Sequence, residues 1–150
     1  MRTIVASSHE STYFEVDELK QFLAPLERAL PYTGGTHNLD DIREAVQSGQ
    51  MQCWPGVESV VITEIVDTPQ KRLLNFFLAA GNLQEIRTLY HTIFDWAKSY
   101  GCDSAVILGR HGWERTFLTR DEGWEKKLIL YEKDLSNGKA TERPDGNDKQ

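Results

Sequence analysis

The stretch that decides the fold covers residues 73–108 and reads LLNFFLAAGNLQEIRTLYHTIFDWAKSYGCDSAVIL. Residues 73–79 are apolar on both alternating faces, which is typical of a central strand covered on both sides. Asn82 and Glu85 then have the spacing of a capping box, and apolar residues recur at helical spacing behind them. Residues 104–108 are too short for a helix and predict a buried strand. A strand, a helix and a strand in this order predict a right-handed crossover between parallel strands.

Immediately upstream, the pattern predicts a three-strand antiparallel meander that ends in the strand at residues 73–79. Residues 51–54 form a short apolar run before the turn chemistry of Pro55-Gly56, and residues 57–66 are a long β-branched run. Residues 67–70 supply the second turn. Both turns are short, so we expect neighbouring strands to pair antiparallel.

The first part of the chain predicts two helices. Apolar residues recur at helical spacing across residues 13–30, where Pro25 should kink or break the helix. Asn38 is placed to cap a second helix that runs through Val46, with two aspartates in its first turn.

Beyond the crossover, residues 113–119 can form a short helix, and residues 124–135 alternate as a final strand after Gly123. Residues 136–150 hold one alanine and no larger aliphatic side chain, so we expect a disordered tail. The sequence thus predicts one α/β domain of the α+β kind over residues 1–135, with a mixed sheet.

Composition excludes several classes of protein. The chain has 150 residues, of which 39% are hydrophobic and 27% charged, and its net charge is −6. This is ordinary for a globular domain, and an acidic surface does not favour nucleic acid as a partner. No apolar run approaches the roughly 20 residues of a membrane-spanning helix. Without a signal-peptide pattern or disulfide spacing at Cys53 and Cys102, we expect a cytoplasmic location.

The order of these elements resembles the GNAT acetyltransferase superfamily over residues 40–135. Residues 96–108 are similar to that family's long helix where it passes through a Gly-Cys turn into the next strand. Glu122-Gly123-Trp124 lies where such proteins carry Gly-Phe before their last strands. The run from Trp54 to Trp113 also resembles short GNAT-like proteins encoded among the structural genes of tailed phages, which implies a virion or host-cytoplasm location.

The resemblance implies an acetyl-CoA site at the connection between the family's fourth strand and its long helix. Family enzymes hold the pyrophosphate there on the backbone amides of a Gln/Arg-x-x-Gly-x-Gly/Ala loop. The corresponding residues here are Leu78, Ala79, Ala80, Gly81 and Asn82. This connection has one glycine and no basic residue, and Glu85 adds a like charge. We therefore expect no cofactor, although these residues would hold acetyl-CoA if the chain were active.

Two positions bear on catalysis. The resemblance implies that a glutamate such as Glu64 can deprotonate an amine through water, although a solvent-facing strand residue is the plainer interpretation. The family's catalytic tyrosine falls at or beside Thr119, and a threonine hydroxyl has no accessible acid pKa.

Other candidates lie at element edges. Arg110 and His111 follow a buried strand and could meet an anion or substrate, although a solvated loop histidine and a surface or ion-paired arginine are the plainer interpretation. Trp54, and Trp113 with nearby Arg115, are candidates for a protein interface, although half-buried packing is the alternative. The histidines share no metal-ligand spacing, so we predict no metal site.

Two functions follow from these patterns. One is a binding or assembly component, which a phage could encode, that kept the GNAT scaffold and lost the cofactor; it would have a protein partner and could form an oligomer. The other is an active acetyl-CoA-dependent N-acetyltransferase that acts on an unknown amine.

Overall fold

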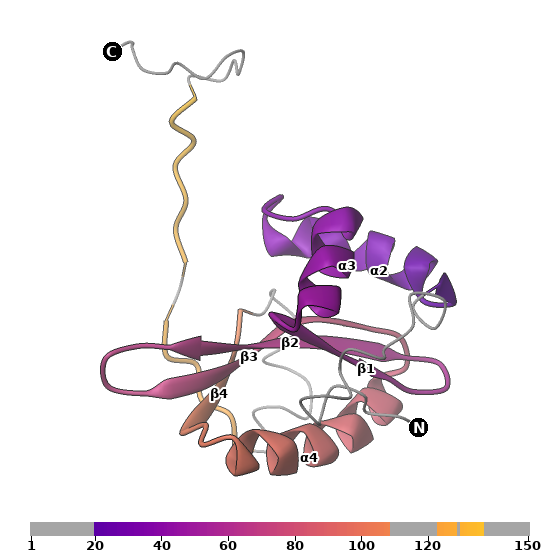
Figure 1. Ribbon diagram of the computed structural model, residues 1–150. Coiled ribbons are helices and arrows are strands. Elements are labelled where there is room, and N and C mark those ends of the chain that lie inside the picture. Colours follow the sequence, from indigo (N-terminus) through magenta and orange to yellow (C-terminus); the bar gives the residue numbers. More distant parts are fainter. Residues whose placement is uncertain (1–19, 109–122, 129, 137–150) are drawn as a thin grey trace. The chain divides into compact units, whose positions relative to one another are not determined.

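The computed structural model describes residues 20–108, 123–128 and 130–136 (Figure 1). Contacts divide the chain into two compact units, Met1–Arg110 and His111–Gln150. The elements of the first unit are, in order, α2 (Leu23–Ala29), the 3₁₀ helix η3 (Leu30–Thr33), α3 (Leu39–Ser48), β1 (Met51–Pro55), β2 (Val60–Asp67), β3 (Arg72–Ala80), α4 (Leu83–Ser99) and β4 (Ser104–Ile107).

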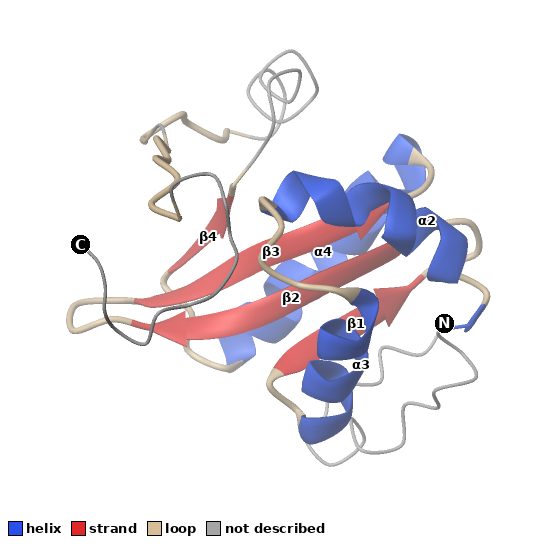
Figure 2. Cartoon of the chain, turned by 90° about the horizontal axis from the view of Figure 1, so that it is seen from above, coloured by secondary structure: helices blue, strands red, loops and turns tan. Residues whose placement is uncertain are grey.

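The four strands form one mixed sheet in the order β1-β2-β3-β4. β1 pairs antiparallel with β2, and β2 with β3, while β3 and β4 run parallel. The predicted meander and parallel crossover are therefore confirmed. α2 and α3 lie on one face of the sheet and α4 on the other (Figures 1 and 2). The register of β2 against β3 shifts between Ile62 and Thr63.

The β1–β2 turn is longer than the sequence predicts. β2 begins at Val60 rather than at residue 57. The Gly56 amide donates a hydrogen bond of 2.7 Å to the Ser59 carbonyl, which closes residues 56–59 into the turn. β-branched Val57 therefore lies in the turn, where its side chain is 85% exposed.

The N-terminal helices begin and end at residues with the expected local chemistry. α2 starts at Leu23 after a non-helical break, so Pro25 lies in its first turn, where a missing N–H is tolerated. The break near Pro25 is thus confirmed, while residues 13–19 lie outside the described part. α3 has a complete capping box between Asn38 and Asp41, and Gly49 ends it with a φ of 87°.

The core on the α4 side of the sheet is aromatic. Trp54 of β1 is fully buried and meets Trp96 of α4 edge-on, with ring centroids 5.2 Å apart. Phe76 of β3 stacks at 4.4 Å on Tyr90 of α4. Such pairs contribute about 0.5–1.5 kcal/mol beyond the area that they bury. They join the helix to the strands beneath it.

A short chain of buried hydrogen bonds lies inside this core. The Trp54 Nε1–H donates to the Thr63 hydroxyl at 3.0 Å, and that hydroxyl donates to Gln52 Oε1 at 2.8 Å. Thr63 is completely buried and Gln52 nearly so. The chain of hydrogen bonds lets β1 and β2 bury an indole without leaving its donor unpaired.

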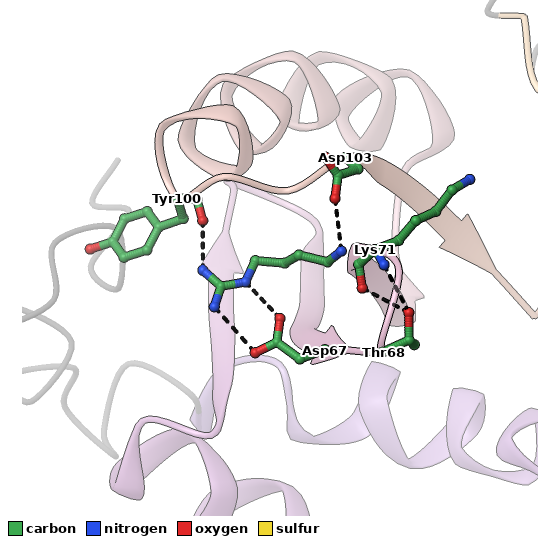
Figure 3. Close-up of polar contacts among 6 residues, drawn as sticks. Asp67, Thr68, Lys71, Tyr100 and Asp103 are labelled. Atoms are coloured by element: carbon green, nitrogen blue, oxygen red, sulfur yellow. Dashed lines mark hydrogen bonds and ion pairs between the residues drawn. The ribbon is translucent and has the colours of Figure 1, made fainter.

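Arg72 links the β2–β3 turn to the α4–β4 connection, and its partners Asp67, Tyr100 and Asp103 are labelled in Figure 3. Its guanidinium donates to both oxygens of Asp67, at 2.7 and 3.2 Å, and to the Tyr100 carbonyl at 2.8 Å. Its backbone amide donates to the Asp103 carboxylate at 2.9 Å. The hydrogen bond from Arg72 lowers the pKa of Asp67. The β2–β3 turn is thereby linked to the connection between α4 and β4.

The structure assigns no helix or strand to residues 123–128 and 130–136 of the second unit. The final strand expected at residues 124–135 is therefore not formed in the described residues. Alternation favours an extended chain, but a strand also needs a hydrogen-bonded neighbour, and no described ladder includes these residues. The helix expected at residues 113–119 lies outside the described part. Among the described residues, no helix is long and apolar enough to cross a membrane.

Candidate functional site

The connection between β3 and α4 is held tightly against the β1–β2 turn. The Asn82 amide donates to the Ser59 hydroxyl at 2.9 Å, and this hydroxyl lies 3.3 Å from the Asn82 carbonyl. Gly81 has a φ of 120°, and a Cβ there would come within 2.6 Å of the Ser59 Cα. Only a residue without a side chain fits such an approach.

The Asn82 side chain caps α4 as the sequence predicts, accepting a hydrogen bond of 3.0 Å from the Glu85 amide. The second half of the predicted capping box is wrong. The Glu85 carboxylate instead accepts hydrogen bonds from the Val57 and Glu58 amides, the latter at 2.8 Å. We call this contact between the α4 carboxylate and the β1–β2 turn the Glu85 latch.

The latch favours the charged form of Glu85. Partial burial acts to raise the pKa, but hydrogen bonds from Ser59 and from the Val57 and Glu58 amides outweigh it and hold the pKa below its usual value. A carboxylate bound by backbone amides is a charge-assisted contact. The negatively charged Glu85 carboxylate therefore lies beside the N-terminus of α4.

The residues that the family resemblance assigns to acetyl-CoA are committed to other contacts. Leu78, Ala79 and Ala80 belong to β3, where they pair with Ile62, Val61 and Val60 of β2. Gly81 and Asn82 lie against Ser59. The connection has neither a glycine-rich loop nor a basic side chain, so it offers little to two phosphates.

Glu64 lies in a different place, on the sheet face beside α3. Its neighbours across the strands are Met51 of β1 and Asn75 of β3, and Asn75 Nδ2 donates to its carboxylate at 2.8 Å. Glu64 is half-buried. It borders a cavity of about 540 Å³ lined by Thr36, His37, Asp41, Glu44, Ala45, Ser48, Gln50, Met51 and Glu64.

This cavity carries three carboxylates and no lysine or arginine in its lining. His37 lies in its wall, with Nδ1 2.7 Å from the Thr36 hydroxyl and its ring edge-on to Phe77 at 4.6 Å. Local sequence reasoning singles out Glu64 but misses His37, Asp41 and Glu44. Those residues join it only because α3 packs beside β1, and no motif at fixed spacing signals that contact.

The prediction that Trp54 is a candidate for a protein interface is wrong. A tryptophan before Pro55-Gly56 predicts an edge position open to a partner, but its side chain has no exposed surface. Alternation along β1 points the indole toward α4, and Thr63 satisfies its N–H. Trp54 is therefore a core residue. The other candidates, Arg110, His111, Trp113, Arg115 and Thr119, lie outside the described residues.

Metal ligands do not gather in the part of the chain that the structure describes. No group of three or more histidine, cysteine, aspartate or glutamate side chains there is arranged to hold an ion. The two described cysteines form no disulfide bond; Cys53 is buried and Cys102 partly so. Burial raises the pKa of Cys102 above its usual value, which disfavours the reactive thiolate.

No protein-family model matches this chain, and no curated protein matches it. Several solved structures are similar to it. A tetramutant of the BH1408 protein from Bacillus halodurans is similar with a TM-score of 0.56 and 12% identity, over 77% of this chain and 95% of that one. Wild-type TTHA1254 from Thermus thermophilus is similar with a TM-score of 0.51 and 17% identity, over 77% of this chain and 92% of that one.

A ribosomal-protein-alanine N-acetyltransferase from Brucella melitensis biovar Abortus 2308 is also similar, with a TM-score of 0.46 and 12% identity, over 74% of this chain and 94% of that one. That score is too low to carry an argument. At such identities structural likeness shows the fold and not the activity. The fold is a mixed α+β fold with a four-strand mixed sheet, similar to the folds of the BH1408 protein and TTHA1254.

Proposed function

We propose that this chain is a GNAT-fold binding component that does not use acetyl-CoA in the manner of the family's enzymes. The observation that carries the proposal is the Glu85 latch, because it places a bound carboxylate where a pyrophosphate would need free amides. The Asn82 side chain also occupies the Glu85 amide, which belongs to the N-terminus of α4 itself. Both contacts compete directly with a phosphate group.

Energy arguments point the same way. A phosphate beside the Glu85 carboxylate would meet a like charge, which costs about 1 kcal/mol at 4 Å in water and more in a drier site. Displacing the carboxylate would break its hydrogen bonds to Val57 and Glu58. Charge-assisted hydrogen bonds contribute about 1.5–3 kcal/mol each. Binding of acetyl-CoA in the manner of the family's enzymes would therefore carry these free-energy costs, and the β3–α4 connection has no basic side chain to offset them.

Thermal unfolding of the full chain with and without acetyl-CoA at about 1 mM tests the proposal. A ligand present at about 100 times its Kd stabilises by about 2.7 kcal/mol, which raises Tm by several degrees. We expect no such rise. A rise that disappears with coenzyme A analogues lacking phosphate groups would overturn the proposal.

The partner in this proposal is a protein, and the proposal extends to a phage-encoded role in the virion or the host cytoplasm. Trp113 and Arg115 remain its candidate contacts on sequence grounds alone. Capture of a partner by the wild-type chain and its loss in Trp113→Ala would support this part. Equal capture by both chains would remove Trp113 from the interface.

A second candidate is an acyl-CoA-dependent N-acyltransferase, and one observation favours it. Glu64 is held by Asn75 at the edge of a cavity lined by carboxylates, and this setting suits a cationic amine. Amine-dependent release of free coenzyme A from acetyl-CoA would establish this function and reject the first one. Glu64→Gln should then abolish turnover through kcat, whereas Glu44→Gln should change mainly KM.

A further inference from the structure

The cavity beside α3 concentrates negative charge that the described residues do not neutralise. Its volume of about 540 Å³ falls within the range of about 300–1,000 Å³ that is typical of ligand sites. Asp41, Glu44 and Glu64 line it. Among the described residues, no lysine or arginine forms an ion pair with any of these three carboxylates. A cleft lined by charges of one sign attracts the opposite sign, so the cavity favours a cation.

α3, which packs beside β1 (Figure 2), supplies one wall of the cavity through a single stripe of its surface. Residues at positions i, i+3, i+4 and i+7 share one face of a helix. The lining residues of α3 have this spacing: Asp41, Glu44, Ala45 and Ser48. The one arginine of α3, Arg43, lies outside the stripe and pairs with Asp40 at 3.1 Å. The side of α3 that faces the cavity is therefore acidic.

Glu64 keeps one carboxylate oxygen open to a ligand. Asn75 Nδ2 donates to its Oε2 at 2.8 Å, whereas no described residue donates to Oε1. Asn75 is neutral, so it orients the carboxylate without cancelling its charge. Glu64 is half-buried, while Asp41 and Glu44 are exposed. The negative charge thus extends from the rim of the cavity into its interior, and a long side chain with a charged head matches that depth.

The lining suits a guanidinium group better than an ammonium group. A guanidinium has five N–H donors in one plane and no acceptor, whereas an ammonium has three donors. The cavity supplies oxygen acceptors of three kinds, namely carboxylates, hydroxyls and a side-chain amide, on Asp41, Glu44, Glu64, Thr36, Ser48 and Gln50. A guanidinium is also more weakly hydrated, which lowers the cost of placing it beside half-buried Glu64. Among protein side chains, arginine carries this group.

We propose that the cavity binds an arginine side chain of the protein partner, with the guanidinium at Glu64 and the aliphatic stem along Ala45 and Met51, the apolar residues of the lining. This inference rests on the proposed function, because it names the chemistry of the partner that a binding protein needs. It is distinct from acyl transfer to an amine, because a guanidinium stays protonated and no bond is made or broken.

An NMR titration of the isotopically labelled full chain with a short neutral peptide that carries one arginine tests the proposal. We expect saturable shifts of the amides of α3 and of those around Glu64, with a Kd of about 1 mM or lower. The same peptide with citrulline, which is nearly isosteric but uncharged, should bind at least about 10-fold more weakly. A lysine peptide should bind at least about 3-fold more weakly, because it lacks the planar fork.

Variants of the chain locate the site. Glu64→Gln keeps the shape and the hydrogen bond from Asn75, and it should raise the Kd about 5- to 10-fold. Glu44→Gln removes a charge at the exposed rim and should raise the Kd only about 2- to 3-fold. Glu27→Gln is the matched control, because it removes the same charge from an exposed position of α2 outside the lining. It should leave the Kd within about 2-fold of the wild-type value.

Several outcomes would overturn the proposal. They are the absence of saturable shifts, equal binding of the arginine peptide and either control peptide, an unchanged Kd in Glu64→Gln, and an equal loss in Glu27→Gln. Tighter binding of spermidine than of the arginine peptide would assign the cavity to a small polycation instead. Any of these results with an unchanged Tm in acetyl-CoA leaves the proposed function in place, whereas a phosphate-dependent rise in Tm overturns the proposed function itself.

Discussion

Gly81 lies where the β3–α4 connection meets the β1–β2 turn. We expect Gly81→Ala to destabilise the protein by about 2–3 kcal/mol, because the new Cβ would collide with the backbone of Glu58 and Ser59 and because φ is positive. Urea unfolding measures the loss. Gly101→Ala is the control, since Gly101 also has a positive φ but has open space around it. Equal losses in both variants would show that the close approach at Gly81 is not important.

Thr63 is the residue on which the buried tryptophan depends for its hydrogen bond. Thr63→Val keeps the shape but leaves Trp54 Nε1 and Gln52 Oε1 without this hydroxyl. We expect a loss of about 1–3 kcal/mol in the free energy of unfolding, followed by tryptophan fluorescence. The same change at exposed Thr88 of α4 should cost less than about 0.5 kcal/mol. A neutral Thr63→Val would mean that the core tolerates an unpaired indole.

At the scale of elements, polar contacts at both ends of α4 add to the core packing that joins this helix to the sheet. The Glu85 latch connects the N-terminus of α4 to the β1–β2 turn, and Arg72 connects the β2–β3 turn to the C-terminal end of α4. These contacts span 27 and 28 residues of sequence. Each holds an element end that local hydrogen bonding would leave free to fray.

Arg72→Met should release one of these ends. The variant keeps an apolar stem and the backbone amide bond to Asp103, but it loses the guanidinium bonds to Asp67 and Tyr100. We expect faster amide hydrogen exchange along β4, with little change in the exchange of β1. Lys71→Met is the control, because Lys71 takes part in the neighbouring turn through its backbone. Unchanged exchange in β4 would contradict the link drawn in Figure 3.

At the scale of the whole molecule, the contacts of Asp67 and Glu85 make stability depend on pH. Both side chains have a lower pKa in the folded protein than their ordinary values of 3.8 and 4.5. A lowered folded pKa means that the unfolded chain binds protons more readily. The stabilisation is therefore complete above the ordinary values and is lost as the pH falls through the folded ones.

We accordingly expect the urea midpoint to stay level from about pH 7 to about pH 5.5 and to fall below about pH 4.5. Glu85→Gln should lower the midpoint at neutral pH and make the acid fall shallower, because one of the groups that titrate is gone. Asp95→Asn is the matched control on an exposed position of α4. An acid fall equally steep in Glu85→Gln would show that the latch does not titrate.

Much of the element order could be predicted from local patterns. α3 begins at its Asn38 cap and ends at Gly49, and α4 begins after Asn82, because caps and apolar periodicity act within a few residues. The predicted start of β2 is wrong, since Val57 favours a strand by composition but lies in a turn closed from Gly56 to Ser59. For residues 124–135 alternation predicts a strand, yet the structure assigns no strand to residues 124–128 and 130–135.

The sequence alone determined α3, α4, the meander and the parallel crossover, because those depend on periodicity, caps and short turns. It also showed that the β3–α4 connection has a single glycine and no basic residue. Only the tertiary structure decided that Glu85 binds Val57 and Glu58, that Trp54 is buried, and that His37 and Glu64 border one cavity. Those contacts join residues far apart along the chain. Which partner such a side chain meets depends on how the helices and strands pack, and not on its neighbours in sequence.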